Sequence, residues 1–214
     1  GHRPDLVKGV DVVVYSTAIP DTNPELVAAR AEGLPVHHRA QLLGYILDQH
    51  ALAIGVVGTH GKGTVSSCTS WLLEAAGRRP GFIIGGLLEN FPGMNARVTG
   101  RELVVAEVDE SDGSLRYVHP HVIVVNNLEA DHLNYYEDLA HIQDTVVEAL
   151  NANPRLQRVL INHDCPGASA LIGRLTAPVT TFGHEAGADI QAVDVTLEPM
   201  RSTFRLRTAD GTSE

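Results

Sequence analysis

The segment from residue 52 to residue 64 reads Leu52-Ala53-Ile54-Gly55-Val56-Val57-Gly58-Thr59-His60-Gly61-Lys62-Gly63-Thr64. Residues 52–57 are apolar or small and predict a buried strand, and a helix is expected from residue 62 to about residue 76. Glycines in the turn between them allow successive backbone N–H groups to point inward and cradle phosphate oxygens. The N-terminus of the following helix adds a partial positive charge. The segment therefore predicts a phosphate-binding loop between a strand and a helix.

This loop departs from the general phosphate-loop pattern at two positions. Counting back from Gly61, the expected first glycine falls at Val56, whereas the glycine present is Gly58. The lysine is followed by Gly63, where a Ser or Thr is usual, so we expect the hydroxyl of Thr64 to serve as the Mg²⁺ ligand instead. The alternative interpretation is a tight strand-to-helix turn with a surface lysine.

The rest of the chain alternates short apolar runs with amphipathic segments. This alternation predicts an α/β fold with a mainly parallel sheet flanked by helices. One helix is marked by apolar residues at three- and four-residue spacing, namely Leu139, Ile142, Val146 and Leu150. Further strands are expected at residues 81–84, 103–106, 121–125 and 158–161.

The first part of the chain predicts two short strands and one helix. Residues 10–15 are rich in valine and predict a buried strand, and residues 34–36 predict a second one. Between them, a helix is expected over residues 24–32. Asn23 is its expected N-cap, because the side chain can accept from the first free N–H groups, and Gly33 is its expected C-cap.

The expected division is between residues 1–48 and residues 49–214. The first piece is too small to bury both faces of a sheet, so we expect it to be the end of an N-terminal domain whose start is missing. Residues 189–197 and 202–208 alternate apolar and polar side chains, which predicts a small antiparallel portion near the C-terminus. The chain stops without a closing helix, so we expect the second domain to be incomplete and a third domain to be absent.

Composition narrows the function classes. The chain has 16 basic and 26 acidic residues, a formal net charge of −10, and no cluster of Lys and Arg to follow a phosphodiester backbone, so a nucleic-acid partner is not expected. Its two cysteines, Cys68 and Cys165, suggest neither a disulfide framework nor a metal knuckle. No apolar run reaches transmembrane length and no signal peptide opens the chain. We therefore expect a soluble protein of the cytoplasm, with no membrane partner.

Polar clusters follow two of the expected strands. The strand at residues 103–106 runs into Glu107-Val108-Asp109-Glu110-Ser111-Asp112, and the strand at residues 122–125 runs into Asn126-Asn127-Leu128-Glu129-Ala130-Asp131-His132. Parallel strands deliver their carboxyl ends to one edge of a sheet, so both clusters should lie beside the phosphate loop. Carboxylates at that edge are where Mg²⁺ is needed. This convergence predicts a magnesium–nucleotide site.

Plainer interpretations remain for each feature taken alone. The acidic segment could be a solvated turn that caps the next helix through Ser111 or Asp112. The remaining histidines are scattered through loops and element ends, where surface or packing roles are more common than metal binding. These are His37, His38, His50, His119, His121, His141, His163 and His184.

Together these motifs resemble the Mur ligase family, in the branch that handles UDP-N-acetylmuramate. Its phosphate loop is commonly Gly-Thr-x-Gly-Lys-Thr/Ser-Thr/Ser, which Gly58–Lys62 matches and Gly63 does not. The segments 107–112 and 127–132 also fit, in the right order. Ser16-Thr17-Ala18-Ile19 with Asn23-Pro24-Glu25 is similar to the end of the family's N-terminal, UDP-binding domain. The resemblance covers nearly the whole chain.

The resemblance implies an ATP-dependent ligase that forms an amide bond through an acyl phosphate, with ATP and Mg²⁺ as cofactors. Its substrates would be UDP-N-acetylmuramate and an amino acid or peptide. Lys62, Glu110 and His132 are the expected catalytic residues, and Thr64, Glu110 and His132 the expected metal ligands. The expected nucleotide-binding residues are Gly58, Thr59, His60, Gly61, Lys62, Gly63, Thr64 and Asn127.

Three activities stay open under this resemblance. Asp109-Glu110-Ser111-Asp112-Gly113-Ser114 favours joining L-alanine to UDP-N-acetylmuramate in peptidoglycan precursor synthesis. Residues 79–86 and 126–129 are closer to the ligase that recycles a murein tripeptide. Lys62-Gly63-Thr64 is similar to folylpolyglutamate synthase, which lacks the other features. A non-catalytic nucleotide-binding module is a separate alternative, and the fragment itself is expected to be inactive on its own.

Overall fold

The computed structural model describes residues 1–111, 113–131, 135–199 and 201–213. Its helical elements are η1 Pro4–Val7, α1 Pro24–Ala31, α2 Arg39–Asp48, α3 Lys62–Ala75, η2 Ser114–Tyr117, α4 Leu139–Ala152 and α5 Pro166–Ser169. Its strands are β1 Val13–Tyr15, β2 Val36–His38, β3 Leu52–Val57, β4 Gly81–Leu88, β5 Met94–Arg97, β6 Leu103–Glu107, β7 Val122–Val125, β8 Arg158–Asn162, β9 Val179–Gly183, β10 Ile190–Glu198, β11 Arg201–Thr208 and β12 Gly211–Ser213.

The large sheet has the strand order β12-β11-β10-β9-β8-β7-β3-β6-β4-β5. From β4 to β10 each neighbouring pair is parallel, which confirms the predicted mainly parallel α/β sheet. The pairs β10–β11 and β11–β12 are antiparallel, as the alternating pattern near the C-terminus predicts. Strand β3 lies between β6 and β7, so the two segments with polar clusters flank the strand that feeds the glycine loop.

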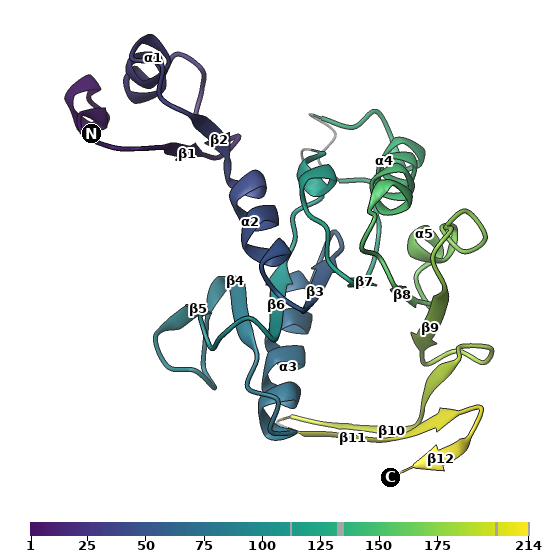
Figure 1. Cartoon of the computed structure of the whole chain (residues 1–214). Helices are drawn as coiled ribbons and strands as arrows, with labels where there is room; N and C mark the ends of the chain where they lie inside the picture. The colour runs from purple at the N-terminus through teal and green to yellow at the C-terminus, as the bar shows by residue number, and fades with distance from the viewer. Residues whose placement is uncertain (112, 132–134, 200, 214) are drawn as a thin grey trace.

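Helices cover the two faces of this sheet unequally. On one face, α2, α4, α5 and η2 enclose a core that includes Leu47, Leu115, Ile142 and Val146, all nearly or fully buried. On the other face, α3 packs against β3, β4 and β6 over a smaller cluster around Phe82. Figure 1 shows α3 apart from the helices of the first face. The position of α3 places the N-terminal end of this helix at the carboxyl edge of the sheet.

The N-terminal part forms a separate small sheet in which β1 and β2 pair in parallel. Asn23 caps α1 by accepting from the backbone N–H groups of Glu25 and Leu26, as predicted, and Gly33 follows the helix with a φ of +72°. Helix α2, which the sequence patterns did not predict, begins directly after β2 and connects this small unit to the large sheet. Figure 1 shows the unit standing out from the rest of the molecule beyond the start of α2.

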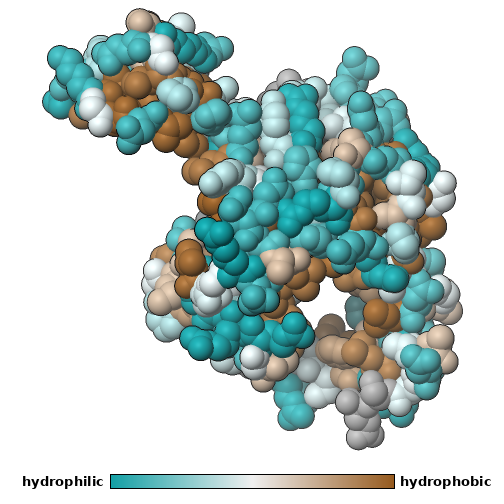
Figure 2. Space-filling model, in the orientation of Figure 1, coloured by the Kyte–Doolittle hydropathy of each residue, from teal (hydrophilic) through white to brown (hydrophobic). Residues whose placement is uncertain are grey.

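The β10–β11 hairpin exposes large apolar side chains to solvent. Leu197 is 76% exposed and Phe204 is 51% exposed, although both are apolar. Figure 2 shows an opening through the molecule between this hairpin and the body of the sheet. Within the described part of the chain, none of the helices combines the length and the apolar character needed to cross a bilayer.

Candidate nucleotide-binding site

The glycine loop connects β3 to α3 and depends on two glycines with positive φ. Gly58 has a φ of +149° and Gly61 a φ of +75°, values that L side chains rarely adopt. A Cβ at Gly58 would lie 3.0 Å from the backbone N of Asn127, so this residue also allows the close approach of the next loop. Gly61 is the N-cap of α3, and its carbonyl accepts the first helical bond, from Val65 N–H. The predicted strand–glycine loop–helix arrangement is therefore present.

Two asparagines after β7 hold the apex of the loop. Asn127 accepts from the backbone N–H of His60 at 2.7 Å and donates to the carbonyl of His60 at 2.9 Å. Asn126 donates to the same carbonyl at 2.9 Å. The backbone N–H of Thr59 donates to the carbonyl of Asn127, and the hydroxyl of Thr59 accepts from Glu129 N–H. The loop is thus braced before a ligand arrives, and the side chain of Asn127 is engaged with the loop itself.

Lys62 and Glu110 meet at the mouth of the loop. Lys62 Nζ donates to the carbonyl of Gly58 at 2.7 Å and lies 3.2 Å from both carboxylate oxygens of Glu110. The Glu110 side chain is only 3% exposed, and its buried Oε2 atom makes no hydrogen bond to any of the described residues. Burial raises the pKa of Glu110, and the nearby Lys62 charge only partly opposes this effect. A buried carboxylate with unused acceptor capacity is a strong candidate for binding a cation.

The position of Glu110 is fixed from the core. The hydroxyl of Tyr136, a residue that is 2% exposed, donates to the backbone carbonyl of Glu110. Tyr136 packs edge-on against Tyr135 and His141, so the ring itself has little freedom to move. Sequence reasoning missed this residue and Asn126, because neither a buried tyrosine nor a second asparagine has a spacing that signals such a role.

Two other carboxylates of the acidic segment, Glu107 and Asp109, already have partners, whereas Asp112 lies outside the described residues. Glu107 accepts from Gly85 N–H at 2.8 Å. Asp109 is ion-paired with Arg39, and it also accepts from Ser111 N–H at 2.9 Å. Burial works to raise the pKa of Asp109, but these hydrogen bonds and the Arg39 charge outweigh it and hold the pKa below its usual value. Element η2 begins after Gly113, so the expectation that Ser111 could serve as its N-cap is wrong.

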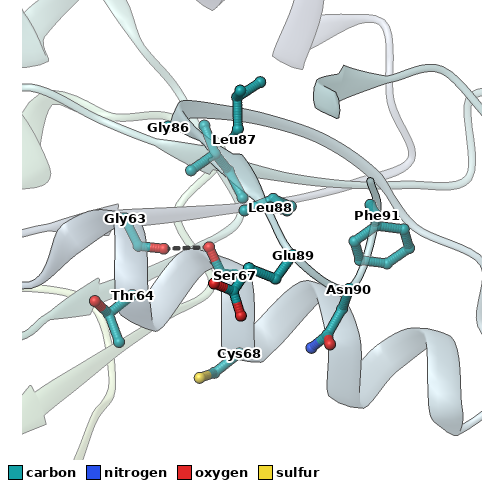
Figure 3. A pocket seen from close by; sticks show the side chains of 11 residues that line it. Gly63, Thr64, Ser67, Cys68, Gly86, Leu87, Leu88, Glu89, Asn90 and Phe91 are labelled. Carbon is teal, nitrogen blue, oxygen red and sulfur yellow. Dashed lines mark hydrogen bonds between the residues drawn. The ribbon is translucent and has the colours of Figure 1, made fainter. Parts of the chain in front are cut away.

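Four of the predicted site residues line two cavities: Thr59 and Lys62 line one, and Gly63 and Thr64 line the other. One, of about 550 Å³, is lined by Lys62, Thr59 and Glu107 among others. The other, of about 530 Å³, is lined by Thr64, Ser67, Cys68 and the segment from Gly86 to Phe91. Figure 3 shows this second cavity, with the Ser67 hydroxyl hydrogen-bonded to the carbonyl of Gly63.

The predicted metal ligands are only partly placed. Glu110 lies at the mouth of the loop, and Thr64 lines the second cavity. His132, predicted as a catalytic residue and metal ligand, lies outside the described residues. Within the described ranges, no three His, Cys, Asp or Glu side chains form a group that could hold a metal ion.

A parallel sheet whose central strand leads into a glycine loop, a lysine and a helix N-terminus defines an α/β protein of the phosphate-binding-loop class. The chain belongs to the Mur ligase family. The Mur ligase middle domain matches residues 56–214, and the pattern described as Mur ligase family, catalytic domain, matches residues 1–51.

Relatives and solved structures place the chain more narrowly within this family. It is 41% identical over 214 residues to UDP-N-acetylmuramate–L-alanine ligase from Xanthomonas oryzae pv. oryzae, covering 100% of this chain and 44% of the relative. It is 39% identical over 207 residues to the ligase of the same name from Syntrophobacter fumaroxidans, covering 96% of this chain and 44% of the relative. The chain thus spans less than half the length of these curated relatives.

Solved structures share the fold over nearly the whole chain. UDP-N-acetylmuramate:L-alanyl-γ-D-glutamyl-meso-diaminopimelate ligase from Neisseria meningitides has a TM-score of 0.85 at 28% identity, covering 99% of this chain and 69% of that one. UDP-N-acetylmuramate-alanine ligase from Thermotoga maritima has a TM-score of 0.81 at 24% identity, covering 97% of this chain and 46% of that one. The α/β fold with its mainly parallel sheet is therefore confirmed as that of Mur ligases.

Proposed function

We propose that this chain is the nucleotide-binding part of a cytoplasmic ligase that joins L-alanine to UDP-N-acetylmuramate in peptidoglycan precursor synthesis. The observation that carries the proposal is the buried Glu110 carboxylate, 3.2 Å from Lys62 Nζ at the mouth of a preformed phosphate loop. Relatives at 39–41% identity that carry this activity in their names support the choice of substrates.

The residues present fit Mg²⁺ and ATP. Glu110 offers a buried carboxylate whose only described ion-pair partner is Lys62, and carboxylate oxygens are ligands that Mg²⁺ prefers; Thr64 would supply a hydroxyl. The backbone of residues 58–64 would cradle the phosphates, with the N-terminus of α3 behind them. When bound, Mg²⁺ would neutralise charge on the phosphates of ATP.

The proposed reaction proceeds by phosphoryl transfer followed by acyl transfer. The carboxylate of UDP-N-acetylmuramate attacks the γ-phosphorus of ATP, and the bond to the β,γ-bridging oxygen breaks to release ADP. The amine of alanine then attacks the acyl carbon, loses a proton, and expels inorganic phosphate. Lys62 would turn from Glu110 toward the phosphates and stabilise the charge that develops on the transferred group. His132 is proposed to help hold a second Mg²⁺.

We also propose that the chain contains parts of two domains with different ligands. Residues 1–48 would belong to the UDP-binding domain, and residues 49–214 to the ATP-binding domain. The separate β1–β2 sheet and the connecting helix α2 support this division.

A second candidate activity is ligation of a murein tripeptide to UDP-N-acetylmuramate. It is favoured by one observation, the TM-score of 0.85 and 28% identity with the Neisseria meningitides ligase whose name specifies that peptide. Both activities use the same nucleotide chemistry, so the acceptor amine distinguishes them.

The deciding experiment measures phosphate release by the full-length gene product with Mg·ATP and UDP-N-acetylmuramate. We expect release to depend on L-alanine, and to be weak or absent with L-alanyl-γ-D-glutamyl-meso-diaminopimelate. The reverse preference would select the recycling activity. Binding of Mg·ATP without release under either condition would indicate a non-catalytic nucleotide-binding module.

A further inference from the structure

We propose that Arg39 binds an anionic group of the UDP-sugar acceptor as it passes from the N-terminal unit to the phosphate loop. This inference rests on the proposed function and adds a specificity-determining residue to it. Arg39 is the first residue of α2, the helix that connects the small β1–β2 unit to the large sheet.

Arg39 lies where two cavities adjoin. One cavity, of about 550 Å³, includes Lys62 and the acidic segment that follows β6. The other, of about 320 Å³, is lined by residues of the N-terminal unit such as Tyr15 and Asn23. Among the described residues that line these cavities, Arg39 is the one that both share. A ligand that extends from one cavity to the other would therefore contact Arg39.

The guanidinium group of Arg39 has bonding capacity left. Its Nη2 atom donates to Asp109, and within the described part of the chain its Nε and Nη1 atoms donate to no protein acceptor. The side chain is 47% exposed, so these remaining donors are accessible. Arginine presents its donors in a rigid planar fork, and one guanidinium group can bind two anions at once. Asp109 would hold one side of the fork while the other side binds the ligand.

The charges around Arg39 explain why an anionic ligand needs it. The larger cavity is lined by three carboxylates, Glu107, Asp109 and Asp131, which would repel an anion. The proposed acceptor carries a diphosphate and a carboxylate, and its carboxylate must reach the γ-phosphate near Lys62. A chain of cations from the N-terminal unit to the loop, with Arg39 followed by Lys62, would offset the repulsion along this path.

The test measures acceptor affinity of the full-length ligase by calorimetry without ATP. Arg39→Gln should weaken the Kd for UDP-N-acetylmuramate about 10- to 100-fold, because a charged hydrogen bond is lost. Arg30→Gln is the matched control, since Arg30 is also exposed and paired, with Asp21 at 2.7 Å, but lines neither cavity. An unchanged Kd in a folded Arg39→Gln protein would overturn the assignment.

Two further variants distinguish a role of Arg39 in ligand binding from a purely structural role in holding the two units together. Asp109→Asn removes the ion pair but leaves the guanidinium group in place, so it should weaken the Kd much less than Arg39→Gln. Equal losses in both variants would overturn the assignment in favour of a structural brace. Arg39→Lys keeps the charge without the fork, and we expect it to give an intermediate Kd. This variant also serves if Arg39→Gln fails to fold.

A second ligand identifies the anionic group. UDP-N-acetylglucosamine has the same diphosphate and lacks the carboxylate. Weaker binding of both ligands to Arg39→Gln would place the diphosphate at Arg39, whereas weaker binding of UDP-N-acetylmuramate alone would place the carboxylate there. If the wild-type protein binds neither ligand, the proposed function fails together with this inference. If it binds both and Arg39→Gln matches it, the inference alone fails.

Discussion

Charged side chains from neighbouring segments lie at both ends of strand β3, but their hydrogen bonding differs between the two ends. At the amino end, Ala53 N–H donates to His121 Nδ1 at 2.9 Å, and Arg155 contacts His121 and Asp48. At the carboxyl end, Lys62 faces a buried Glu110 whose Oε2 atom accepts no hydrogen bond from the described part of the chain. At the first end the charged groups contact one another and the backbone, and the second end keeps capacity for a ligand.

At the amino end, the guanidinium group of Arg155 is hydrogen-bonded to several protein acceptors. Its guanidinium group donates to Asp48 Oδ1 at 2.6 Å, to the carbonyl of His50 at 2.8 Å and, at 3.4 Å, to the carbonyl of Leu47. It thereby holds the segment where α2 ends, in which the carbonyl of Leu47 also accepts from the backbone N–H of His50. The comparison teaches that remaining bonding capacity, rather than residue type, distinguishes a functional charge from a structural one.

The largest expected effect is at the carboxyl end. Lys62→Ala should lower kcat/KM of the full-length ligase about 1,000-fold, because the charge that stabilises the transferred phosphoryl group is lost. Its melting temperature should change little. Lys8, the other lysine of the chain, is exposed, and Lys8→Ala is the control for an activity assay by phosphate release. If Lys62→Ala turns over at the wild-type rate, Lys62 does not contribute to the reaction.

Glu110→Gln should lower activity about 10- to 100-fold and raise the Mg²⁺ concentration needed for half-maximal rate. It should not lower the melting temperature. The pKa of Glu110 is raised by burial, so at neutral pH the fold favours an uncharged group there over a carboxylate. Glu102, exposed just before β6, provides the control Glu102→Gln at the opposite end of the same strand. A wild-type Mg²⁺ dependence would argue against the metal role.

Arg155→Ala should have the opposite effect to Lys62→Ala: it should lower stability and leave activity nearly unchanged. Loss of its charged hydrogen bonds should lower the free energy of unfolding by about 2–3 kcal/mol, measured by urea denaturation. Activity per folded molecule should stay near that of the wild type, since Arg155 lies at the far end of β3 from the loop. A large loss of kcat without loss of stability would break the distinction between the two ends.

The smallest effect concerns His121. Burial, together with the Arg155 charge, lowers the pKa of His121 below its ordinary value of 6.5. The unfolded chain therefore takes up a proton at a higher pH than the folded one, and stability is lost as pH falls from about 6.5 through the folded pKa. His121→Asn should flatten this loss in denaturation curves at about pH 7.5 and about pH 5.5. Exposed His37→Asn should keep the wild-type slope.

Much of the large sheet is predictable from the sequence because its signals are local. Strand β3 has the predicted limits, and α3 differs from the prediction only at its end. Glycines and a lysine directly after an apolar run specify the loop within a few residues. Helix α2 was missed because it begins immediately after a short strand, and its capping box comes from His38 and Gln41, an unusual pair for this role.

The sequence predicted which main residues meet at the candidate site, but not the hydrogen bonds and ion pairs between its loops. Parallel strands bring Lys62 and Glu110 to one edge, and this juxtaposition follows from topology alone. The engagement of Asn127 with His60, by contrast, depends on the φ values of Gly58 and Gly61 and on how closely two loops approach. Arg39 was also missed, because its partner Asp109 is distant in sequence and only the packed fold brings them together.

The hydroxyl of Tyr136 ties the backbone of Glu110 to the interior of the protein. The position of this carboxylate relative to the loop therefore depends on a buried aromatic side chain. Loss of this hydroxyl should therefore disturb the site, although Tyr136 itself is buried in the core. A screen for loss of function would accordingly recover changes at Tyr136 alongside those at the lysine and the glutamate.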